Sequence, residues 1–243
     1  MSSAAAQRDI PPEMVYTPPD CPTTWREGAI LPVDKPEALP SFDVVETVRE
    51  GTGVAKVGHA GTLDPMATGL LIVLVARPAT RLQEACMHLP KTYEATLRLG
   101  ETTPSHDTET EVTGRTDPSG VTRADVEAAR EQFLGTIEQV PPMYSAVQVG
   151  GERLYEKARR GETVDRRPPR QVDIDRFELA DWTPPEVSFR IACSKGTYIR
   201  ALARDLGEEL GVGGHLTALR RTAIGFFSVE ESWILSALEE TLS

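Results

Sequence analysis

The chain has 243 residues, of which 40% are hydrophobic and 26% are charged, a composition typical of folded globular proteins and unlike disordered or fibrous chains. Its longest apolar run, Gly69–Ala76, is far shorter than the roughly 18 residues that a membrane helix needs. The N-terminal residues lack the basic end and apolar centre of a signal peptide, so we expect a cytoplasmic protein. Three cysteines without a CxxC pair argue against a disulfide framework and a structural zinc site.

The charge is distributed unevenly along the chain. The 26 basic and 37 acidic residues give a net charge of −11, which alone predicts repulsion from nucleic acid. Residues 153–170 nevertheless carry seven cations and three anions, and residues 190–221 carry six cations and three anions. These segments indicate either basic surfaces that face a polyanion or ordinary solvated helix faces.

The first part of the chain changes from an irregular segment to periodic elements. Residues 1–26 are rich in Ala, Pro and Thr without periodicity, which predicts a loose tail, with folded structure beginning near Gly28. Ala29–Val33 is predicted to form a short strand. Phe42–Arg49 has valines at helical spacing and is predicted to form a helix that Ser41 caps.

Further along the chain, strand and helix patterns alternate. The glycines of 51–61 predict a loop, and the continuous apolar run Leu70–Val75 predicts a strand buried on both faces. Strict alternation over Lys91–Gly100 predicts a half-buried strand. Thr122–Phe133 opens with a capping-box pattern and is predicted to be a helix.

The last clear pair of elements is a strand followed by a helix. Val187–Cys193 alternates as a strand. Thr197 is expected to cap a helix that ends at Gly211 and has an apolar stripe of Ile, Leu and Ala. Strands and helices are therefore mixed throughout, and the fold class that we expect is α+β.

Common cofactor and metal motifs do not account for the sequence. Gly51-Thr52-Gly53 resembles part of a dinucleotide fingerprint, but no third glycine follows in register. The sequence contains no GKS or GKT loop, no GxSxG elbow and no HExxH motif, and its four histidines lack metal-ligand spacing. We therefore expect no cofactor and no metal.

One acidic residue stands out in a glycine-rich loop just ahead of the apolar run. Asp64 is followed directly by Pro65, which fixes its own φ and favours an extended Asp64. The backbone would therefore set the direction of the carboxylate. The alternative is a simple Asx turn before proline.

Two other places combine polar chemistry with a defined position. Arg200 would lie in the first turn after Thr197, where a cation is disfavoured by about 0.3–1 kcal/mol unless an anion compensates it. A bound carboxylate or phosphate near Lys195 would do so, and a solvated surface arginine is the alternative. Tyr93 lies on the apolar face of its strand, where it either packs in the core or stacks on a nucleobase.

At these places the sequence resembles the TruB family of tRNA pseudouridine synthases, from about Gly28 to Ile224. The matching motifs are Gly58–Pro65 with Ala67–Leu71, Lys91–Tyr93, Val140–Ala146, Gly196–Arg200 and Leu219–Arg221. By this resemblance Asp64 is the catalytic aspartate, Tyr93 the base-stacking tyrosine and Arg200 the arginine that pairs with the aspartate. The residues expected to bind the substrate or its RNA are His59, Tyr198, Leu219, Lys195, Arg159 and Arg160.

The resemblance also implies a fold and a domain plan. We expect the pseudouridine synthase fold, a mixed and mainly antiparallel sheet flanked by helices and loops, over residues 27–243. A basic insertion at about residues 140–173 would cover the RNA. The family pattern Asp-Lys-Pro-x-Gly continues here as Asp34-Lys35-Pro36-Glu37-Ala38, which leaves the shape of that turn open. Many members carry a C-terminal PUA module, and none is expected here because only twenty-two residues follow Arg221.

The implied reaction is the isomerisation of uridine 55 in the T-loop of tRNA to pseudouridine, after the base is flipped out of the loop. The aspartate would act as a nucleophile, at the ribose or the base, or would remove a ribose proton to give a glycal. We expect the T-arm as the partner, a monomeric enzyme, no guide RNA and no membrane. The alternatives are a guide-RNA-dependent synthase, a non-catalytic RNA-binding module and a glycosidase with paired carboxylates.

The acidic composition suggests where such an enzyme would work. Only five of the 26 cations are lysine. An acid-rich, lysine-poor surface suits a cytoplasm of high salt, where a Debye length of about 3 Å at 1 M shortens repulsion from RNA. A halophilic host is therefore our hypothesis.

Overall fold

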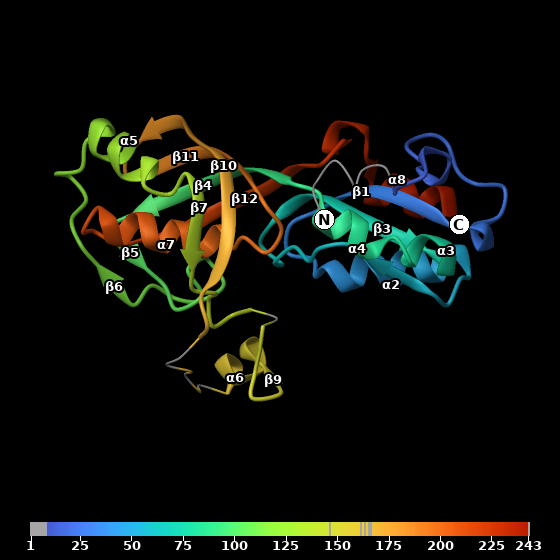
Figure 1. Ribbon diagram of the computed structural model, residues 1–243, viewed down its shortest axis with the longest axis horizontal. Helices are drawn as coiled ribbons and strands as arrows, with labels where there is room; N and C mark the ends of the chain where they lie inside the picture. Colours follow the sequence, from blue (N-terminus) through green and yellow to red (C-terminus); the bar gives the residue numbers. More distant parts are fainter. Residues whose placement is uncertain (1–8, 146, 161, 163, 165–166, 243) are drawn as a thin grey trace. The chain divides into compact units, whose positions relative to one another are not determined.

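The computed structural model describes residues 9–145, 147–160, 162, 164 and 167–242, and the chain forms two compact units (Figure 1). Unit 1 comprises residues 1–93 with 219–243, and unit 2 comprises residues 94–218. Strands β4 (Lys91–Leu99) and β12 (Gly214–Ile224) contribute to both units. Each unit has buried hydrophobic residues of its own.

Unit 1 is built on a mixed sheet. Its other strands are β1 (Ala29–Lys35), β2 (Val57–His59), β3 (Thr68–Val75), β13 (Phe227–Ser228) and β14 (Trp233–Ile234). The strand order is β14-β1-β3-β12-β4, with β2 also paired to β3 and β13 to β12. β1 pairs antiparallel with β3, whereas β14 is parallel to β1, and β12 is parallel to β3.

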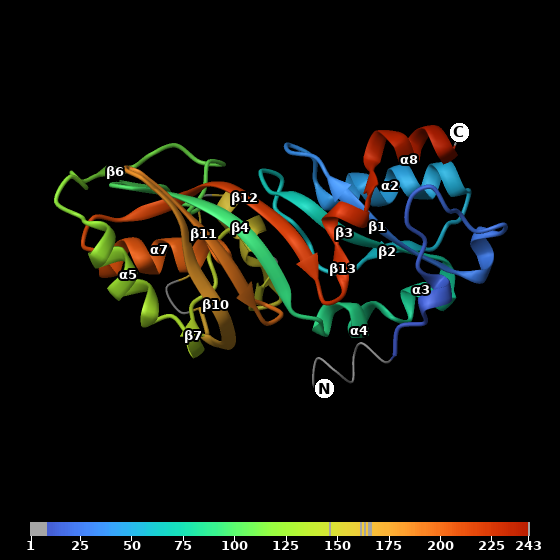
Figure 2. The same cartoon turned by 90° about the horizontal axis from the view of Figure 1, so that it is seen from above.

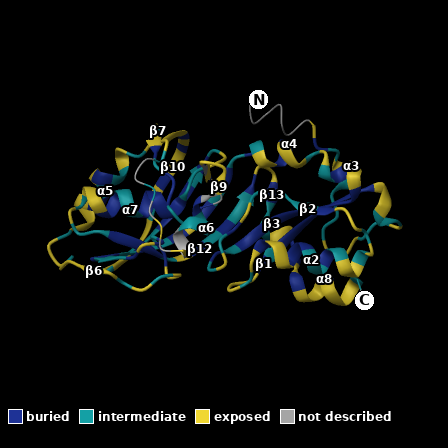
Figure 3. Cartoon of the chain, turned by 90° about the horizontal axis from the view of Figure 1, so that it is seen from below, coloured by how far each residue is buried: buried dark blue, intermediate teal, exposed yellow. Residues whose placement is uncertain are grey.

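Helices cover both faces of β1 and β3. Helices α2 (Ser41–Thr52) and α8 (Leu235–Leu242) lie on one face, and α3 (Ala76–Thr80) and α4 (Gln83–His88) lie on the other (Figure 2). Alternate residues of β3 enter the two opposite cores, with Leu70, Ile72 and Leu74 in one and Leu71, Val73 and Val75 in the other. The prediction of a strand buried on both faces is confirmed, and β3 is dark blue in Figure 3.

The structure corrects the expected loose tail at residues 1–26 for the part that it describes. Ile10 is only 3% exposed, and Val15 forms a bridge to Ile30 of β1. The indole Nε1 of Trp233 donates a hydrogen bond of 3.1 Å to the Tyr16 carbonyl. The 3-10 turns Pro12–Met14 and Trp25–Glu27 complete this segment. Its apolar residues lack a helix or strand period because they cover the core as an irregular segment.

Unit 2 has its own sheet, with helices packed against it. Its strand order is β12-β4-β11-β10-β7, with β11 at Glu186–Cys193, β10 at Arg170–Thr183 and β7 at Gly135–Gln139. β10 pairs antiparallel with both β11 and β7. The predicted alternation of β4 and β11 is confirmed by their burial patterns. Helices α5 (Arg123–Glu131) and α7 (Ile199–Glu209) pack against each other, and α5 also packs on β10.

Two short ribbons complete unit 2. β5 (Glu101–Thr102) pairs with β6 (Gly114–Arg115), and β8 (Gln148–Val149) pairs with β9 (Glu152–Arg153). The second ribbon and helix α6 (Leu154–Arg159) lie within the expected insertion. Regular sheet structure resumes at Arg170, slightly before the expected end of the insertion at 173.

One of the three expected helix caps is present. Thr122 and Asp125 form the predicted capping box of α5. Ser41 is instead the first residue of α2, and Thr197 donates to a carbonyl in the turn while Tyr198 is the N-cap of α7. Both hydroxyls have tertiary or turn partners that a local pattern does not reveal.

Candidate functional site

In unit 1, Asp64 lies half-buried in a tight turn between β2 and β3. The N–H of Ala67 donates a hydrogen bond of 3.0 Å to the Asp64 carbonyl, which closes the turn. Leu63 on one side is buried, and Pro65 on the other side is exposed. The carboxylate is therefore attached to a backbone that is fixed before and after it.

Ser41 fixes the residue just before Asp64. Its hydroxyl donates to the Leu63 carbonyl at 2.9 Å and accepts from the Leu63 N–H at 2.8 Å. Both side chains are buried. One hydroxyl thus satisfies both polar backbone groups of Leu63, which would otherwise be costly to bury.

Lys35 holds the other side of the turn. Its fully buried ammonium donates to the carbonyls of Pro36 and Leu39 at 2.7 Å and of Pro65 at 3.2 Å. Burial lowers the pKa of Lys35 to about 8, and the negative charge of Asp64 opposes this shift. The negative charge of Asp64 therefore favours the charged form of Lys35.

The turn after Lys35 closes although its sequence departs from the family pattern. Ala38 stands where that pattern has glycine, and its φ of 60° is in the left-handed region. Lys35 binds the carbonyls at both ends of this turn, Pro36 and Leu39. The turn thus keeps a glycine-like backbone at a cost of about 1–2 kcal/mol for the non-glycine residue.

Two arginines of β12 secure the same loop. The buried Arg221 donates to the carbonyls of Leu70 at 2.7 Å and Gly61 at 2.9 Å. Arg220 makes a bidentate pair with Asp34, at 3.0 and 2.6 Å. Both arginines belong to the motif Leu219–Arg221, but only Leu219 was predicted as a site residue, since a paired structural arginine has no distinct local signature.

Close packing at Gly69 explains why this position of the motif is glycine. Its φ is +100°, and an added Cβ would lie 2.3 Å from the carbonyl oxygen of Arg221. Strand β12 can therefore approach the start of β3 only where β3 has no side chain.

The remaining predicted residues of unit 1 lie on its strands. His59 ends β2, and burial together with the positive charge of Arg221 lowers its pKa. Its carbonyl accepts a hydrogen bond of 2.8 Å from Gln83. Tyr93 on β4 and Leu219 on β12 are both nearly buried.

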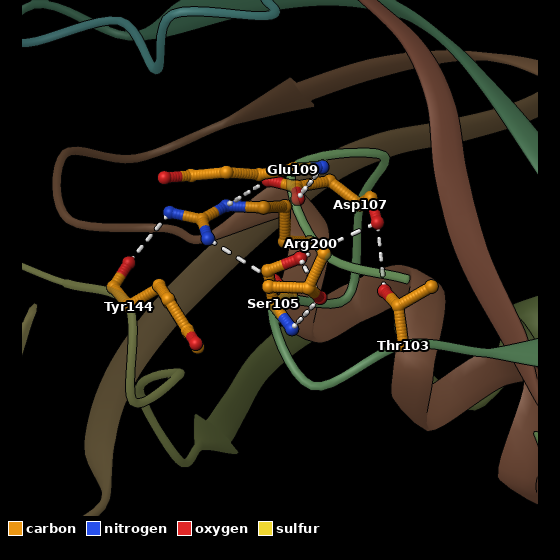
Figure 4. A network of polar contacts seen from close by, with 7 residues as sticks. Thr103, Ser105, Asp107, Glu109, Tyr144 and Arg200 are labelled. Carbon is orange, nitrogen blue, oxygen red and sulfur yellow. Dashed lines mark hydrogen bonds and ion pairs between the residues drawn. The ribbon is translucent and has the colours of Figure 1, made fainter. Parts of the chain in front are cut away.

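In unit 2, Arg200 is held by a buried network (Figure 4). It is 3% exposed, and its guanidinium donates to the carbonyls of Ser105 at 3.1 Å and Tyr144 at 2.8 Å. Its Nε lies 3.4 Å from Oδ2 of Asp107, whose side chain is fully buried. Asp107 therefore places an anion beside Arg200 within unit 2.

Asp107 was not among the residues predicted from the sequence. Its carbonyl accepts from Thr103 at 2.7 Å, and its Oδ1 accepts from the Glu109 N–H at 2.9 Å. It lies in the polar segment 102–120, where a buried acid looks the same in sequence as the exposed acids around it. Asp64 belongs to unit 1 and Arg200 to unit 2, so the expected pair between them stays a prediction.

Tyr198 and Lys195 lie at the start of α7. The backbone N–H and carbonyl of Tyr198 both bind the side chain of Gln139, at 2.8 and 3.0 Å. Lys195 is exposed in the turn that precedes the helix. Tyr198 itself is half-buried.

Of the two arginines predicted to bind RNA in the insertion, the structure describes the side chain of one. Arg160 is exposed and forms ion pairs with Glu152 at 3.1 Å and Glu162 at 2.7 Å. Arg159 ends α6, and its side chain lies outside the described residues. The positive charge of the insertion is therefore partly neutralised by its own carboxylates.

The residues that the structure describes contain neither a cluster of metal ligands nor a membrane-spanning helix. Within them, no three His, Cys, Asp or Glu side chains are grouped as metal ligands. No helix there has both the length and the apolar character to cross a bilayer.

Comparison with known proteins identifies the family. A sequence model described as "TruB family pseudouridylate synthase (N terminal domain)" matches residues 49–199, more than half of the chain. The chain belongs to the TruB family. A second TruB model, described as "tRNA pseudouridylate synthase B C-terminal domain", matches residues 200–243. The resemblance noted in the sequence is therefore confirmed.

Curated TruB relatives cover most of the chain. "tRNA pseudouridine synthase B" of Mycobacterium sp. (strain KMS) is 48% identical over 217 residues, which are 88% of this chain and 72% of that protein. The protein of the same name from Phocaeicola vulgatus is 45% identical over 224 residues, which are 90% of this chain and 94% of that protein. The predicted enzyme class, a tRNA pseudouridine synthase, is confirmed.

A solved structure shows the same fold at lower identity. "Structure of H/ACA RNP bound to a substrate RNA containing 2'-deoxyuridine" matches with a TM-score of 0.67 and 26% identity. The match covers 96% of this TruB chain and 59% of that chain, so the chain spans about three fifths of its length. Together with the family match, this confirms the predicted pseudouridine synthase fold with its mixed sheet.

Proposed function

We propose that this TruB enzyme converts uridine 55 in the T-loop of tRNA to pseudouridine, with Asp64 as the essential side chain. The observation that carries the proposal is the half-buried Asp64 turn, whose backbone is held by Ser41, Lys35 and Arg221. A carboxylate fixed in this way is suited to act on one atom of a bound nucleoside.

The reaction is an isomerisation and needs neither an oxidant nor an energy source. The bond between N1 of uracil and C1′ of ribose breaks, and its electron pair stays with the base. The base rotates, a bond forms between C5 and C1′, C5 loses its proton and N1 gains one. Asp64 assists either as a nucleophile or as the base that removes a ribose proton.

The other site residues have supporting roles in this proposal. Arg200, oriented by Asp107, pairs with Asp64 and keeps it ionised. Tyr93 stacks on the detached uracil and takes part in removing the C5 proton. Tyr198 and Leu219 line the uracil pocket.

Recognition of tRNA requires that the nucleotide leave the folded loop, at a cost of a few kcal/mol. His59 occupies the place beside the displaced base. Lys195, Arg159 and Arg160 contact phosphates, and RNA must compete with Glu152 and Glu162 for Arg160. We propose that the enzyme acts as a single chain in the cytoplasm, on the T-arm and without a guide RNA.

Tritium release from tRNA labelled at uracil C5 tests the proposal. Asp64→Asn removes the ionised carboxylate, so we expect no release above background while tRNA binding persists. Asp43→Asn, an exposed acid in the first turn of α2, is the matched control and should release label at the wild-type rate. Normal release by Asp64→Asn would contradict the assignment.

The same assay separates the alternatives. A T-arm transcript without added RNA should be a substrate, and a guide-dependent synthase would leave it unmodified. A non-catalytic binding module would bind it and release no label. A glycosidase would release free uracil, which we do not expect.

A further inference from the structure

Gln139 is a buried glutamine between two parts of unit 2. It is the last residue of β7 and precedes the motif Val140–Ala146, where the chain leaves the sheet for the insertion. The residue is only 1% exposed, although glutamine is usually a surface residue. Burying a carboxamide is costly unless both of its ends are hydrogen-bonded.

Both ends of this carboxamide bind one residue. Nε2 of Gln139 donates to the Tyr198 carbonyl at 3.0 Å, and Oε1 accepts from the Tyr198 N–H at 2.8 Å. Tyr198 is the N-cap of α7, a position that Ser, Thr, Asp or Asn usually occupies. The glutamine thus binds both backbone groups of the N-cap residue, from 59 residues away in sequence.

Two more contacts join the same segments. Arg200 donates to the Tyr144 carbonyl at 2.8 Å, and Arg204 donates to the Val140 carbonyl at 3.4 Å. Residues 139–144 are therefore bound to the first turns of α7 at three places. Of these three contacts, only that of Gln139 binds two backbone groups of one residue. It therefore restricts the rotation of the Tyr198 backbone as well as its distance from β7.

We propose that Gln139 is a positioning residue for the reaction: it sets the backbone of Tyr198 and, through the first turn of α7, the guanidinium of Arg200. The inference rests on the proposed function, because it assumes that these two side chains serve the substrate. Gln139 itself is buried and acts only through Tyr198.

Two substitutions remove the contact in steps. Gln139→Glu keeps the size and the acceptor for the Tyr198 N–H but cannot donate to the Tyr198 carbonyl when ionised. Gln139→Met is similar in size and removes both hydrogen bonds. We expect the single-turnover rate to fall about 10-fold for Gln139→Glu and about 100-fold for Gln139→Met, because small misplacements of reacting groups lower the rate by such factors. The Kd for tRNA should stay within about 2-fold, because a buried side chain offers RNA no contact.

Gln132→Met is the matched control. Gln132 also joins α7, through a hydrogen bond of 2.8 Å to Glu209 at the other end of the helix, but it is exposed. Its loss should leave both the rate and the Kd unchanged. Thermal unfolding of each variant gives the folded fraction at the assay temperature, and rates are normalised to it.

The outcomes decide between positioning and simple structural support. A normalised rate equal to wild type in both Gln139 variants would overturn the inference, and so would a weaker Kd with an unchanged rate. Complete unfolding of both variants would also overturn it, because a positioning residue leaves the fold intact. If wild-type enzyme forms no pseudouridine, the proposed function fails instead.

Discussion

At the scale of single residues, the Asp64 turn depends on hydrogen bonds from side chains far away in sequence. Ser41 binds both backbone groups of Leu63, and Lys35 binds the carbonyl of Pro65. Asp64 lies between these two clamped residues. Its direction thus comes from the proline that the sequence shows and from two buried side chains whose contacts it does not show.

Ser41→Ala tests this clamp. The variant leaves the Leu63 N–H and carbonyl buried without the hydroxyl, so we expect a loss of about 1–3 kcal/mol in the free energy of unfolding. Displacement of Asp64 should lower the single-turnover rate by about 10- to 100-fold. Urea unfolding and tritium release measure the two effects.

Ser232→Ala provides the comparison for that experiment. Ser232 is also buried in unit 1 and donates a hydrogen bond of 2.6 Å to the Val229 carbonyl, away from the Asp64 turn. It should lose stability but keep the wild-type rate. Equal rates in the two serine variants would show that the Ser41 clamp does not serve catalysis.

At the scale of elements, the segment 103–113 between β5 and β6 combines a left-handed residue with several internal hydrogen bonds. Thr103, Ser105 and Asp107 form its internal hydrogen bonds, and His106 among them has a φ of 62°. The His106 carbonyl accepts from the Leu216 N–H at 3.0 Å, which ties the segment to β12. This segment carries the carboxylate that orients Arg200.

His106 should make the protein sensitive to acid. Burial, and then the positive charges of Arg204, Arg200 and Arg167, lower its pKa from 6.5 to about 4. Between these values the unfolded chain binds a proton that the folded chain does not. The stability linked to His106 is therefore present above pH 6.5 and is lost toward pH 4, by about 1.4 kcal/mol per pH unit.

His106→Asn should remove this dependence, because asparagine tolerates the left-handed backbone and does not titrate. We expect the free energy of unfolding of the variant to fall less than that of wild type between pH 6.5 and 4. Urea unfolding at several pH values measures it. Parallel curves for the two proteins would contradict the assignment to His106.

At the scale of the whole molecule, the charge has to be reconciled with an RNA substrate. The net charge is −11, and the exposed Arg160 of the insertion is paired with carboxylates. Long-range attraction to tRNA is therefore weaker than the basic segments alone suggest. At 1 M salt the Debye length is about 3 Å, so repulsion between the acidic surface and tRNA would be screened beyond that distance.

The hypothesis of a halophilic host predicts how the rate depends on salt. Most enzymes that bind nucleic acid lose affinity steeply as salt rises. This enzyme should instead keep or raise its rate of tritium release between dilute buffer and molar KCl, because screening reduces repulsion from tRNA. A steep loss of rate in molar KCl would contradict the hypothesis.

The sequence by itself determined the family, the α+β class, the buried strand β3 and the alternating strands β4 and β11. These features depend on local periodicity or on contiguous motifs, which can be recognised in the sequence without knowledge of the fold. The capping box of α5 was predictable for the same reason, since its two partners are three residues apart.

Only the tertiary structure decided which polar groups meet. The contacts of Ser41 with Leu63, Asp107 with Arg200, and Gln139 with Tyr198 join residues 22 to 93 positions apart, and none has a sequence period. The packing of residues 10–26 onto unit 1 was missed because scattered apolar residues cover a core without forming a regular element. Hydrogen bonding of buried polar groups is set by the surrounding fold, so the sequence led us to propose reacting residues but did not show what holds them.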